Sequence, residues 1–480
     1  MWETVMKTVL LRTVFLSFLL AIVSQNLLSA EFYVSKGGDD GNSGSASSPW
    51  KTIGKASKQL TAGDTVLIKA GEYEETIEPA RSGSNGKYIT YKAYGGDKVI
   101  ITNPPSRLGF DFSYLSYIEI DGLYFDGKKP WTGSNIKHWG YMENGSYNVI
   151  RNCNMQFSEG WYGIRLAGKS LYNQFINNKF DYTGVYDDGS GDDPGDMISL
   201  VDESNFNLIE GNRFTHGGHN LLTIETSFNV VRSNYFNNSF EDIVGPGKGN
   251  RNLALKGKST SGYNLFEYNV VTGTKSSSDS SHPMGMKADG TNQIIRRNFI
   301  FDNIQEAVSG LARDGIDYIR RQKVFHNVIY NSGGPAWRIQ FMSGAKDVKD
   351  NVFKNNIAYN NRGKPKKSSF DTDLYINISN SSNPGGDPIS GTVVQSNSII
   401  SANNQDAVIY VNGLGKKPII WFENNYPNSF SGNVEVSPNF VSSDPKGIDD
   451  VRLDGSSKLI DMGVPLTFTT VSGSGKMISV

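Results

Sequence analysis

Apolar and polar residues alternate in short runs along most of the chain, and one pattern returns several times between Gly195 and Phe299. Each repeat has an alternation such as Met197-Ile198-Ser199-Leu200, then a loop, then an asparagine between branched or aromatic residues, as in Leu208 to Phe214. A period of two residues predicts β-strands. The residues around each asparagine suit a half-buried, pleated surface.

The recurring asparagines set the period of the chain. By subtraction they are separated by 34, 22, 35, 29, 29 and 29 residues, and they are Asn178, Asn212, Asn234, Asn269, Asn298, Asn327 and Asn356. Self-similarity at this spacing is typical of a solenoid whose coils carry loops of different length. If equivalent strands stack in parallel, each position becomes a column with a rise of roughly 4.8 Å per coil, and asparagine amides can hydrogen-bond along it. We therefore predict an all-β fold, a right-handed parallel β-helix.

The first 30 residues have the features of a signal peptide. Lys7 and Arg12 precede the apolar run from Val14 to Val23, and Ala30 is a small residue of the kind that signal peptidase accepts. The run is short for a membrane span, so we expect export to the periplasm, the cell surface or the medium, without integral membrane association. Residues 31–480 are then expected to form one domain, because a solenoid grows by adding coils.

Net charge and cysteine content limit the partners and the covalent cross-links that we expect. The formal net charge is -1, which does not indicate nucleic acid or a membrane surface as a partner. Cys153 is the one cysteine, so no internal disulfide forms. It stands where a recurring asparagine would be, and we expect a buried structural thiol.

Both ends resemble those of secreted β-helix proteins. Residues 31–80 contain Phe32-Tyr33-Val34-Ser35, Pro49-Trp50-Lys51-Thr52-Ile53 and Ala62-Gly63-Asp64. In the proteins that they resemble, a short amphipathic helix, here expected from Ile53 to Leu60, caps the open end and prevents pairing with another chain. Residues 430–480 resemble the closing region. We also expect a coil at Trp421 to Asn425 and long loops at Thr274 to Pro283 and Arg362 to Ser390.

Pairs of alternating apolar residues predict which side chains point into the core. The expected inward pairs are Ile164/Leu166, Ile198/Leu200, Leu222/Ile224, Leu253/Leu255, Met284/Met286 and Trp337/Ile339. The outward residues between them are Arg165, Ser199, Thr223, Ala254, Gly285 and Arg338, and the next outward column contains Glu225, Lys256 and Lys287. This predicts a shallow trough with a floor of small residues. A lysine stacked roughly 5 Å from another lysine and from a glutamate can serve as a base, although an exposed ion-pair ladder is the alternative.

An acidic loop precedes this region. The segment from Asp187 to Asp196 contains five aspartates and three glycines. Such carboxylates repel one another unless a cation neutralises them, and oxygen-only ligands suit Ca²⁺. We expect Ca²⁺ near Asp192, Asp193 and Asp196, with Glu225 as a further ligand. A solvated acidic turn is the alternative.

Two coils resemble the catalytic region of the alginate lyase and chondroitinase B family. The resemblance rests on Asn252 to Lys258, on Ser259 and on Asn264 to Asn269. It implies that Lys256 is the base, with Lys258 as its rival, and that Lys287 stands where that family has an arginine. It also implies Ca²⁺ as the ion that neutralises the uronate. We expect Lys287 or His219 to assist the leaving group. The expected substrate contacts are Arg251, Lys258, His282, Arg313 and Arg338.

A second resemblance, to polygalacturonase, rests on Gly195 to Leu200, Gly217-Gly218-His219 and Leu255-Lys256. That inverting mechanism needs two carboxyl groups about 6.5 to 9.5 Å apart. A further acid should fall near Tyr162, but the nearest is Glu159. We therefore predict a monomeric polysaccharide lyase for an acidic, uronate-containing polysaccharide. A hydrolase, a C5-epimerase and a non-catalytic glycan-binding protein remain open.

Overall fold

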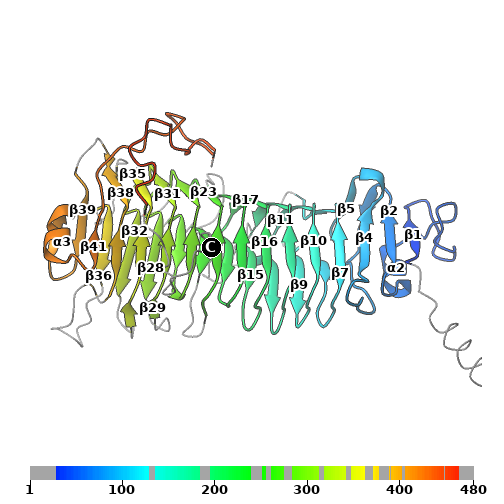
Figure 1. Cartoon of the computed structure of the whole chain (residues 1–480). Helices are drawn as coiled ribbons and strands as arrows, with labels where there is room; N and C mark the ends of the chain where they lie inside the picture. Colours follow the sequence, from blue (N-terminus) through cyan, green and yellow to red (C-terminus); the bar gives the residue numbers. More distant parts are fainter. Residues whose placement is uncertain are drawn as a thin grey trace, which may run out of the picture.

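A computed structural model describes residues 29–128, 136–183, 195–238, 251–255, 261–274, 284–312, 318–341, 347–362, 371–377, 389, 391–402, 406–447 and 449–463. These residues wind into an elongated stack of coils, with the N-terminal end of the stack blue and the C-terminal end orange and red in Figure 1. Three long sheets run along the stack, and neighbouring strands within them are parallel, apart from the antiparallel pair β39 and β40.

Each central coil contributes one strand to each of the three long sheets. The first sheet contains β1 (Glu31–Val34), β2 (Thr65–Ile68), β4 (Ile89–Ala93), β7 (Ile118–Asp121), β10 (Val149–Arg151), β13 (Gln174–Ile176), β16 (Leu208–Glu210), β19 (Val230–Arg232), β22 (Leu265–Glu267), β26 (Ile294–Arg296), β30 (Lys323–Phe325), β34 (Val352–Lys354), β37 (Val393–Gln395) and β41 (Phe430–Ser431). The second contains β3 (Gly71–Tyr73), β5 (Val99–Ile101), β8 (Tyr124–Asp126), β11 (Asn154–Ser158), β14 (Lys179–Thr183), β17 (Arg213–Gly217), β20 (Tyr235–Asn237), β23 (Val270–Thr272), β27 (Phe299–Phe301), β31 (Val328–Tyr330), β35 (Ile357–Asn361) and β38 (Ser398–Ser401). The third contains β6 (Leu108–Asp111), β9 (His138–Glu143), β12 (Tyr162–Ala167), β15 (Asp196–Leu200), β18 (Asn220–Ile224), β21 (Arg251–Leu255), β24 (Met286–Ala288), β28 (Val308–Ala312), β32 (Trp337–Phe341), β36 (Leu374–Asn377), β39 (Val408–Val411) and β40 (Gly415–Pro418). A small parallel sheet adds β25 (Gly290–Thr291), β29 (Tyr318–Arg320) and β33 (Asp347–Lys349).

The core is one continuous column of apolar side chains inside the coils. Phe180, Phe214 and Phe236 occupy equivalent positions on β14, β17 and β20, and their rings stack with centroids 4.8 Å apart at each step. Register is fixed because a shift of one residue would turn such side chains outward. The fold is therefore the parallel β-helix that the alternation predicts.

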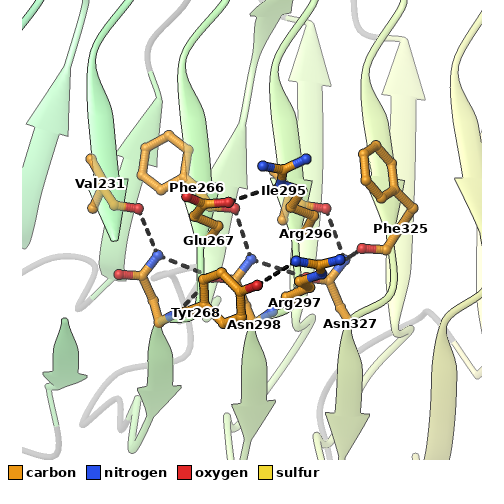
Figure 2. Close-up of polar contacts among 11 residues, drawn as sticks. Val231, Phe266, Glu267, Tyr268, Ile295, Arg296, Arg297, Asn298, Phe325 and Asn327 are labelled. Atoms are coloured by element: carbon orange, nitrogen blue, oxygen red, sulfur yellow. Dashed lines mark hydrogen bonds and ion pairs between the residues drawn. The ribbon is translucent and has the colours of Figure 1, made fainter. Parts of the chain in front are cut away.

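The predicted asparagine ladder is confirmed, and Figure 2 shows part of it. Asn298 donates through Nδ2 to the Phe266 carbonyl at 3.1 Å and to Asn327 Oδ1 at 3.0 Å, and its Oδ1 accepts from the Asn269 backbone at 2.9 Å. The ladder continues beyond the predicted positions to Asn397 and Asn433. These buried amides satisfy the backbone groups of each tight corner.

Cys153 lies in the ladder column, as predicted. Its backbone N–H donates to Asn178 Oδ1 at 2.9 Å, and its thiol is buried. Burial raises the pKa of this thiol to about 12. A second ladder, which the sequence reasoning missed, runs along the other end of the first sheet through Asn148, Asn173, Asn207, Asn229 and Asn264.

The corner before this second ladder carries a stack of aromatic rings. Its members are Tyr117, Tyr147, Tyr172, Phe206, Phe228 and Tyr263, with consecutive centroids 4.9, 5.0, 5.1, 5.1 and 5.2 Å apart. All six have φ between 57° and 61°, in the left-handed region. Stacking offsets part of the cost of this conformation.

The structure confirms the predicted helix at the N-terminal end and corrects two predictions nearer the C-terminal end. Helix α2 (Ile53–Gln59) begins after Thr52, whose side chain accepts from the Lys55 N–H, and it buries Ile53 and Ala56 against the first coil. Residues 419–425, expected to be a strand, form helix α3 (Ile419–Asn425), which buries Ile419 and Phe422, three residues apart. Strand β36 lies inside the segment expected to be one long loop, Arg362 to Ser390. The single turn η1 (Tyr94–Gly96) joins β4 to β5.

The C-terminal segment turns back over the outside of the second sheet. Val451 and Phe440 pack against Phe299, Phe301 and neighbouring apolar side chains there. This segment is orange to red above the stack in Figure 1. Among the described residues, no helix is both long and apolar enough to cross a bilayer.

Candidate functional site

The predicted column of small side chains lies on the third sheet. Arg165 is in register with Ser199, Ser199 with Thr223, and Thr223 with Ala254, and Ser199 and Thr223 are 7% and 1% exposed. The flanking residues Ile164, Leu166, Ile198, Leu200, Leu222 and Ile224 lie in the core. The predicted inward pairs and the small-residue floor are therefore confirmed across β12, β15 and β18, and by register in β21.

The structure corrects the predicted position of Lys287. Ala254 pairs with Lys287, not with Gly285, so Lys287 belongs to the floor column and not to the column of Glu225. The inward pair on β24 is Met286 and Ala288, and Met284 is buried from a position before the strand. The expected row of Glu225, Lys256 and Lys287 is therefore wrong at Lys287.

Lys287 is engaged in a buried ion pair. It is 5% exposed, and its Nζ lies 2.7 Å from Oδ2 of Asp289, which is fully buried. The next residue in the column, Ser309, is also fully buried, and its Oγ has no hydrogen-bond partner among the described residues. Because an ion pair requires the ammonium form, Lys287 fits a positively charged contact better than a base.

Arg338 lies one rung beyond Ser309, in the same column. It is 3% exposed; its Nη1 lies 2.5 Å from Oε1 of the buried Glu306, and its Nη2 donates to Gln340. The structure thus confirms its place in the column, but the expected role as an open substrate contact does not agree with this burial and pairing.

A polar cluster lies where β15 and β18 begin. His219 Nδ1 is 2.9 Å from Oδ1 of Asp196, and the same oxygen accepts from the backbone N–H of Asn220 at 3.1 Å and from its Nδ2 at 2.9 Å. Asn220 Nδ2 also donates to Thr223 Oγ1 at 3.0 Å, which links the cluster to the trough floor. The predicted proximity of His219 and Asp196 is therefore confirmed.

The expected metal set needs correction at Glu225. Asp196 is bonded to Asn220 on the next coil, and Glu225 lies five residues beyond Asn220, just after β18. At roughly 3.3 Å per residue this separates Asp196 and Glu225 by roughly 16 Å, too far to share an ion. Among the described residues, no group of three or more His, Cys, Asp or Glu side chains converges as a metal site.

Several expected site residues lie outside the described residues. These are Asp192, Asp193, Lys256, Lys258, His282 and Arg313. Arg251 is described in its backbone, which pairs with Asn220 as the sequence predicted. The roles expected for these residues stay predictions.

The N-terminal side of the trough contains a cluster that sequence reasoning missed. His138 stacks on Tyr162 with centroids 4.2 Å apart, and its Nδ1 donates to the Tyr162 carbonyl at 2.7 Å. Burial, with nearby cations as a lesser cause, lowers the pKa of His138 to about 4. Tyr162 pairs with Asp196, so the position where a second acid of a polygalacturonase-like site was expected holds a tyrosine. Glu159 is instead 3.0 Å from Arg107.

These sheets, ladders and caps define a right-handed parallel β-helix. Residues 32–196 match the family described as "Pel9A-like, right handed beta helix region". That match ends on Asp196, at the edge of the trough.

Two curated proteins match short segments. The uncharacterized protein YwoF of Bacillus subtilis (strain 168) is 37% identical over 100 residues, 20% of this chain and 21% of YwoF. Pectate lyase PEL9 of Emericella nidulans is 36% identical over 77 residues, 16% of this chain and 19% of PEL9. The matched segments thus span about a fifth of each relative.

Solved structures share the fold at low identity. The GH136 lacto-N-biosidase from Eubacterium ramulus has a TM-score of 0.53 at 15% identity, over 78% of this chain and 68% of that protein. Pectate lyase Pel9A has a TM-score of 0.48 at 16% identity, over 94% of this chain and 96% of Pel9A. Likeness at this level of identity shows the fold alone, and a fold does not determine a reaction.

Proposed function

We propose that this protein is an exported polysaccharide lyase that cleaves an acidic, uronate-containing polysaccharide by β-elimination. The observation that carries the proposal is the match of residues 32–196 to the Pel9A-like helix region, joined to a trough that begins at the end of this match. The name of the matched fungal relative, a pectate lyase, supports the same reaction class. Export is supported by the charged and apolar pattern of residues 1–30.

The floor of small side chains gives a polymer room to lie along the third sheet. In the proposed reaction Lys256 removes the proton at C5 of a uronate, and the electron pair forms the C4–C5 double bond. The bond from C4 to the glycosidic oxygen then breaks. His219, which Asp196 holds through Nδ1, donates a proton through Nε2 to the departing oxygen. Lys287 supplies a fixed positive charge near the floor.

The chemistry of Asp192, Asp193 and Asp196 suits Ca²⁺, because all three offer carboxylate oxygens within or beside a glycine-containing segment. Bound Ca²⁺ would neutralise the substrate carboxylate and make the C5 proton more acidic. Glu225 is not part of this proposed set, because of its distance from Asp196.

The proposal is tested by incubating the purified protein with polygalacturonate, alginate and dermatan sulfate while ultraviolet absorbance and reducing ends are followed. We expect both to rise together on one polymer. Lys256→Ala should abolish the absorbance, and Lys169→Ala, which removes an exposed lysine just beyond β12, should not. Reducing ends without absorbance would instead indicate a hydrolase, and loss of the C5 proton without cleavage an epimerase.

A further inference from the structure

Among the parallel strands of the third sheet, the outward column contains three described cations, and their environments differ. Lys287 and Arg338 are each buried and paired with a carboxylate, at 2.7 and 2.5 Å. Arg165 is half-buried, and among the described residues no carboxylate lies within 4.0 Å of it. Its charge is therefore available to a ligand in a way that the charges of the other two are not.

Aromatic side chains, not acids, hold Arg165 in place. Its guanidinium carbon lies 5.2 Å from the centroid of the Tyr162 ring, on the same strand, β12. Tyr141 is its rung neighbour on β9, and Ser199 its rung neighbour on β15. Its Nε is buried and has no hydrogen-bond partner within the described ranges of the chain, where the contact with the ring is what holds the side chain. A guanidinium held this way keeps its terminal N–H groups for a planar anion.

The surroundings favour an anion with a ring attached. The half-buried Tyr141 supplies apolar surface beside the charge, whereas the Tyr162 ring is already stacked by His138 and contacted by Arg165 itself. Glu143 contacts the Tyr141 hydroxyl at 3.5 Å and forms no ion pair with Arg165 among the described residues. A uronate offers both features, because its sugar ring presents C–H groups and its carboxylate accepts two parallel hydrogen bonds from an arginine.

Register places this position relative to the proposed chemistry. Arg165 is one rung from Ser199, two from Thr223 and three from Ala254, which precedes Lys256 by two residues. Three rungs correspond to roughly 14 Å along the stack. A polymer lying in the trough would therefore reach Arg165 with a sugar that is not the one being cleaved.

We propose that Arg165, Tyr141 and Tyr162 form a distal subsite that binds the carboxylate and ring of a second uronate, and that this subsite selects acidic over esterified polymer. This inference rests on the proposed function and names its specificity determinant. Because the contact forms far from the bond that breaks, it stabilises ground state and transition state alike. Loss of the contact is therefore expected to raise KM and leave kcat nearly unchanged.

The test separates binding from catalysis. Binding of polygalacturonate and of its methyl ester is measured by affinity electrophoresis or calorimetry for the wild type, Arg165→Ala, Arg165→Lys and Arg213→Ala. Arg213 is the matched control, because it too lies over a tyrosine, 4.2 Å from the Tyr235 centroid, but on the second sheet. Circular dichroism and the urea midpoint check that each variant is folded.

We expect the wild type to prefer the acid over the ester, and Arg165→Ala to lose about tenfold to a hundredfold in affinity for the acid alone. Arg165→Lys should recover part of the loss, and Arg213→Ala should match the wild type. If Arg165→Ala keeps the full preference, the subsite is overturned while lyase activity, followed separately by absorbance, still stands. If the wild type shows no preference for the acid, the subsite is overturned, and the absence of unsaturated product in the same preparation would reject the lyase as well.

Discussion

The asparagine ladder makes a sharp prediction about stability, and Asn298 is the residue that tests it best. Asn298→Ala removes the Oδ1 that accepts from the backbone N–H of Asn269 at 2.9 Å and from its Nδ2 at 3.0 Å. It also removes the Nδ2 that donates to the Phe266 carbonyl and to Asn327 Oδ1. Figure 2 shows these bonds as one continuous chain. All three asparagines are at most 3% exposed, so water does not replace the lost partners.

The expected loss of stability depends on which polar groups keep a second hydrogen-bond partner after the substitution. Asn269 Nδ2 still reaches the Val231 carbonyl at 2.9 Å, and Asn327 Oδ1 still accepts the backbone N–H of residue 298 at 3.0 Å. The Asn269 backbone N–H loses its acceptor, Asn298 Oδ1. One orphaned buried donor costs about 1–3 kcal/mol, and each further lost bond about 1 kcal/mol. With one orphaned donor and three further lost bonds, we therefore expect a loss of about 4–6 kcal/mol, a large part of the stability of an ordinary domain.

Urea unfolding followed by circular dichroism measures this loss. The matched control is Asn154→Ala, because Asn154 lies on β11 with a half-buried side chain that makes no hydrogen bond within the described residues. The control should change the free energy of unfolding by less than about 1 kcal/mol. Equal effects of the two substitutions would refute the view that the ladder amides stabilise the stack.

Four further predictions concern charge, metal and the ladder column. Burial lowers the pKa of His138 to about 4, from 6.5 in an unfolded chain. The contribution of neutral His138 to the free energy of unfolding is therefore complete above pH 6.5 and is lost as the pH drops toward 4. His138→Gln should reduce this loss in urea titrations at low pH and leave the urea midpoint at neutral pH nearly unchanged. Lys287→Met should cost about 3–5 kcal/mol because it removes the ammonium that lies 2.7 Å from the buried Asp289 carboxylate. The double substitution with Asp289→Leu should cost less than the single one, which a double-mutant cycle checks and an additive outcome would contradict. Chelation with EGTA should abolish lyase activity and added Ca²⁺ should restore it, whereas full activity in the chelator would reject the Ca²⁺ proposal. Cys153→Asn should leave the urea midpoint unchanged or raise it, because the new amide can donate to Asn178 Oδ1; a large loss would mean that the thiol position does not admit the ladder geometry.

The sequence alone predicted the stack and its main ladder because both rest on local rules. Alternation fixes which side chains enter the core, and asparagines between strands mark each corner. Phe214 and Asn212, for example, take the predicted positions in the core and in the ladder. The second ladder was missed because its asparagines, such as Asn207, precede the strands and vary in their local context.

The errors arose where two local patterns compete. Met284-Gly285-Met286 and Met286-Lys287-Ala288 both alternate, and the larger methionines concealed the correct pair, which uses Ala288. Helix α3 was missed because Trp421 to Asn425 resembles an apolar strand followed by a ladder asparagine. Pro418 before the helix and the spacing of Ile419 and Phe422 were the available signals.

The environment of Arg165 could not be predicted in the same way. Its position in the outward column follows from alternation, but its distinction is that Lys287 and Arg338 have acidic partners within the described part of the chain and it has none there. Those partners, Asp289 and Glu306, lie at other positions of their coils. Only the three-dimensional arrangement of neighbouring coils shows which of these cations has an acidic partner among the described residues.

The most direct test of the account is a single progress curve. Wild-type protein is mixed with polygalacturonate in the presence of Ca²⁺, and ultraviolet absorbance is recorded beside reducing ends, with Lys256→Ala in a parallel cell. We predict equal molar increases of unsaturated and reducing ends for the wild type and neither for the variant. Equal activity of the two proteins, or reducing ends without absorbance, would contradict the proposed base and the proposed elimination, respectively.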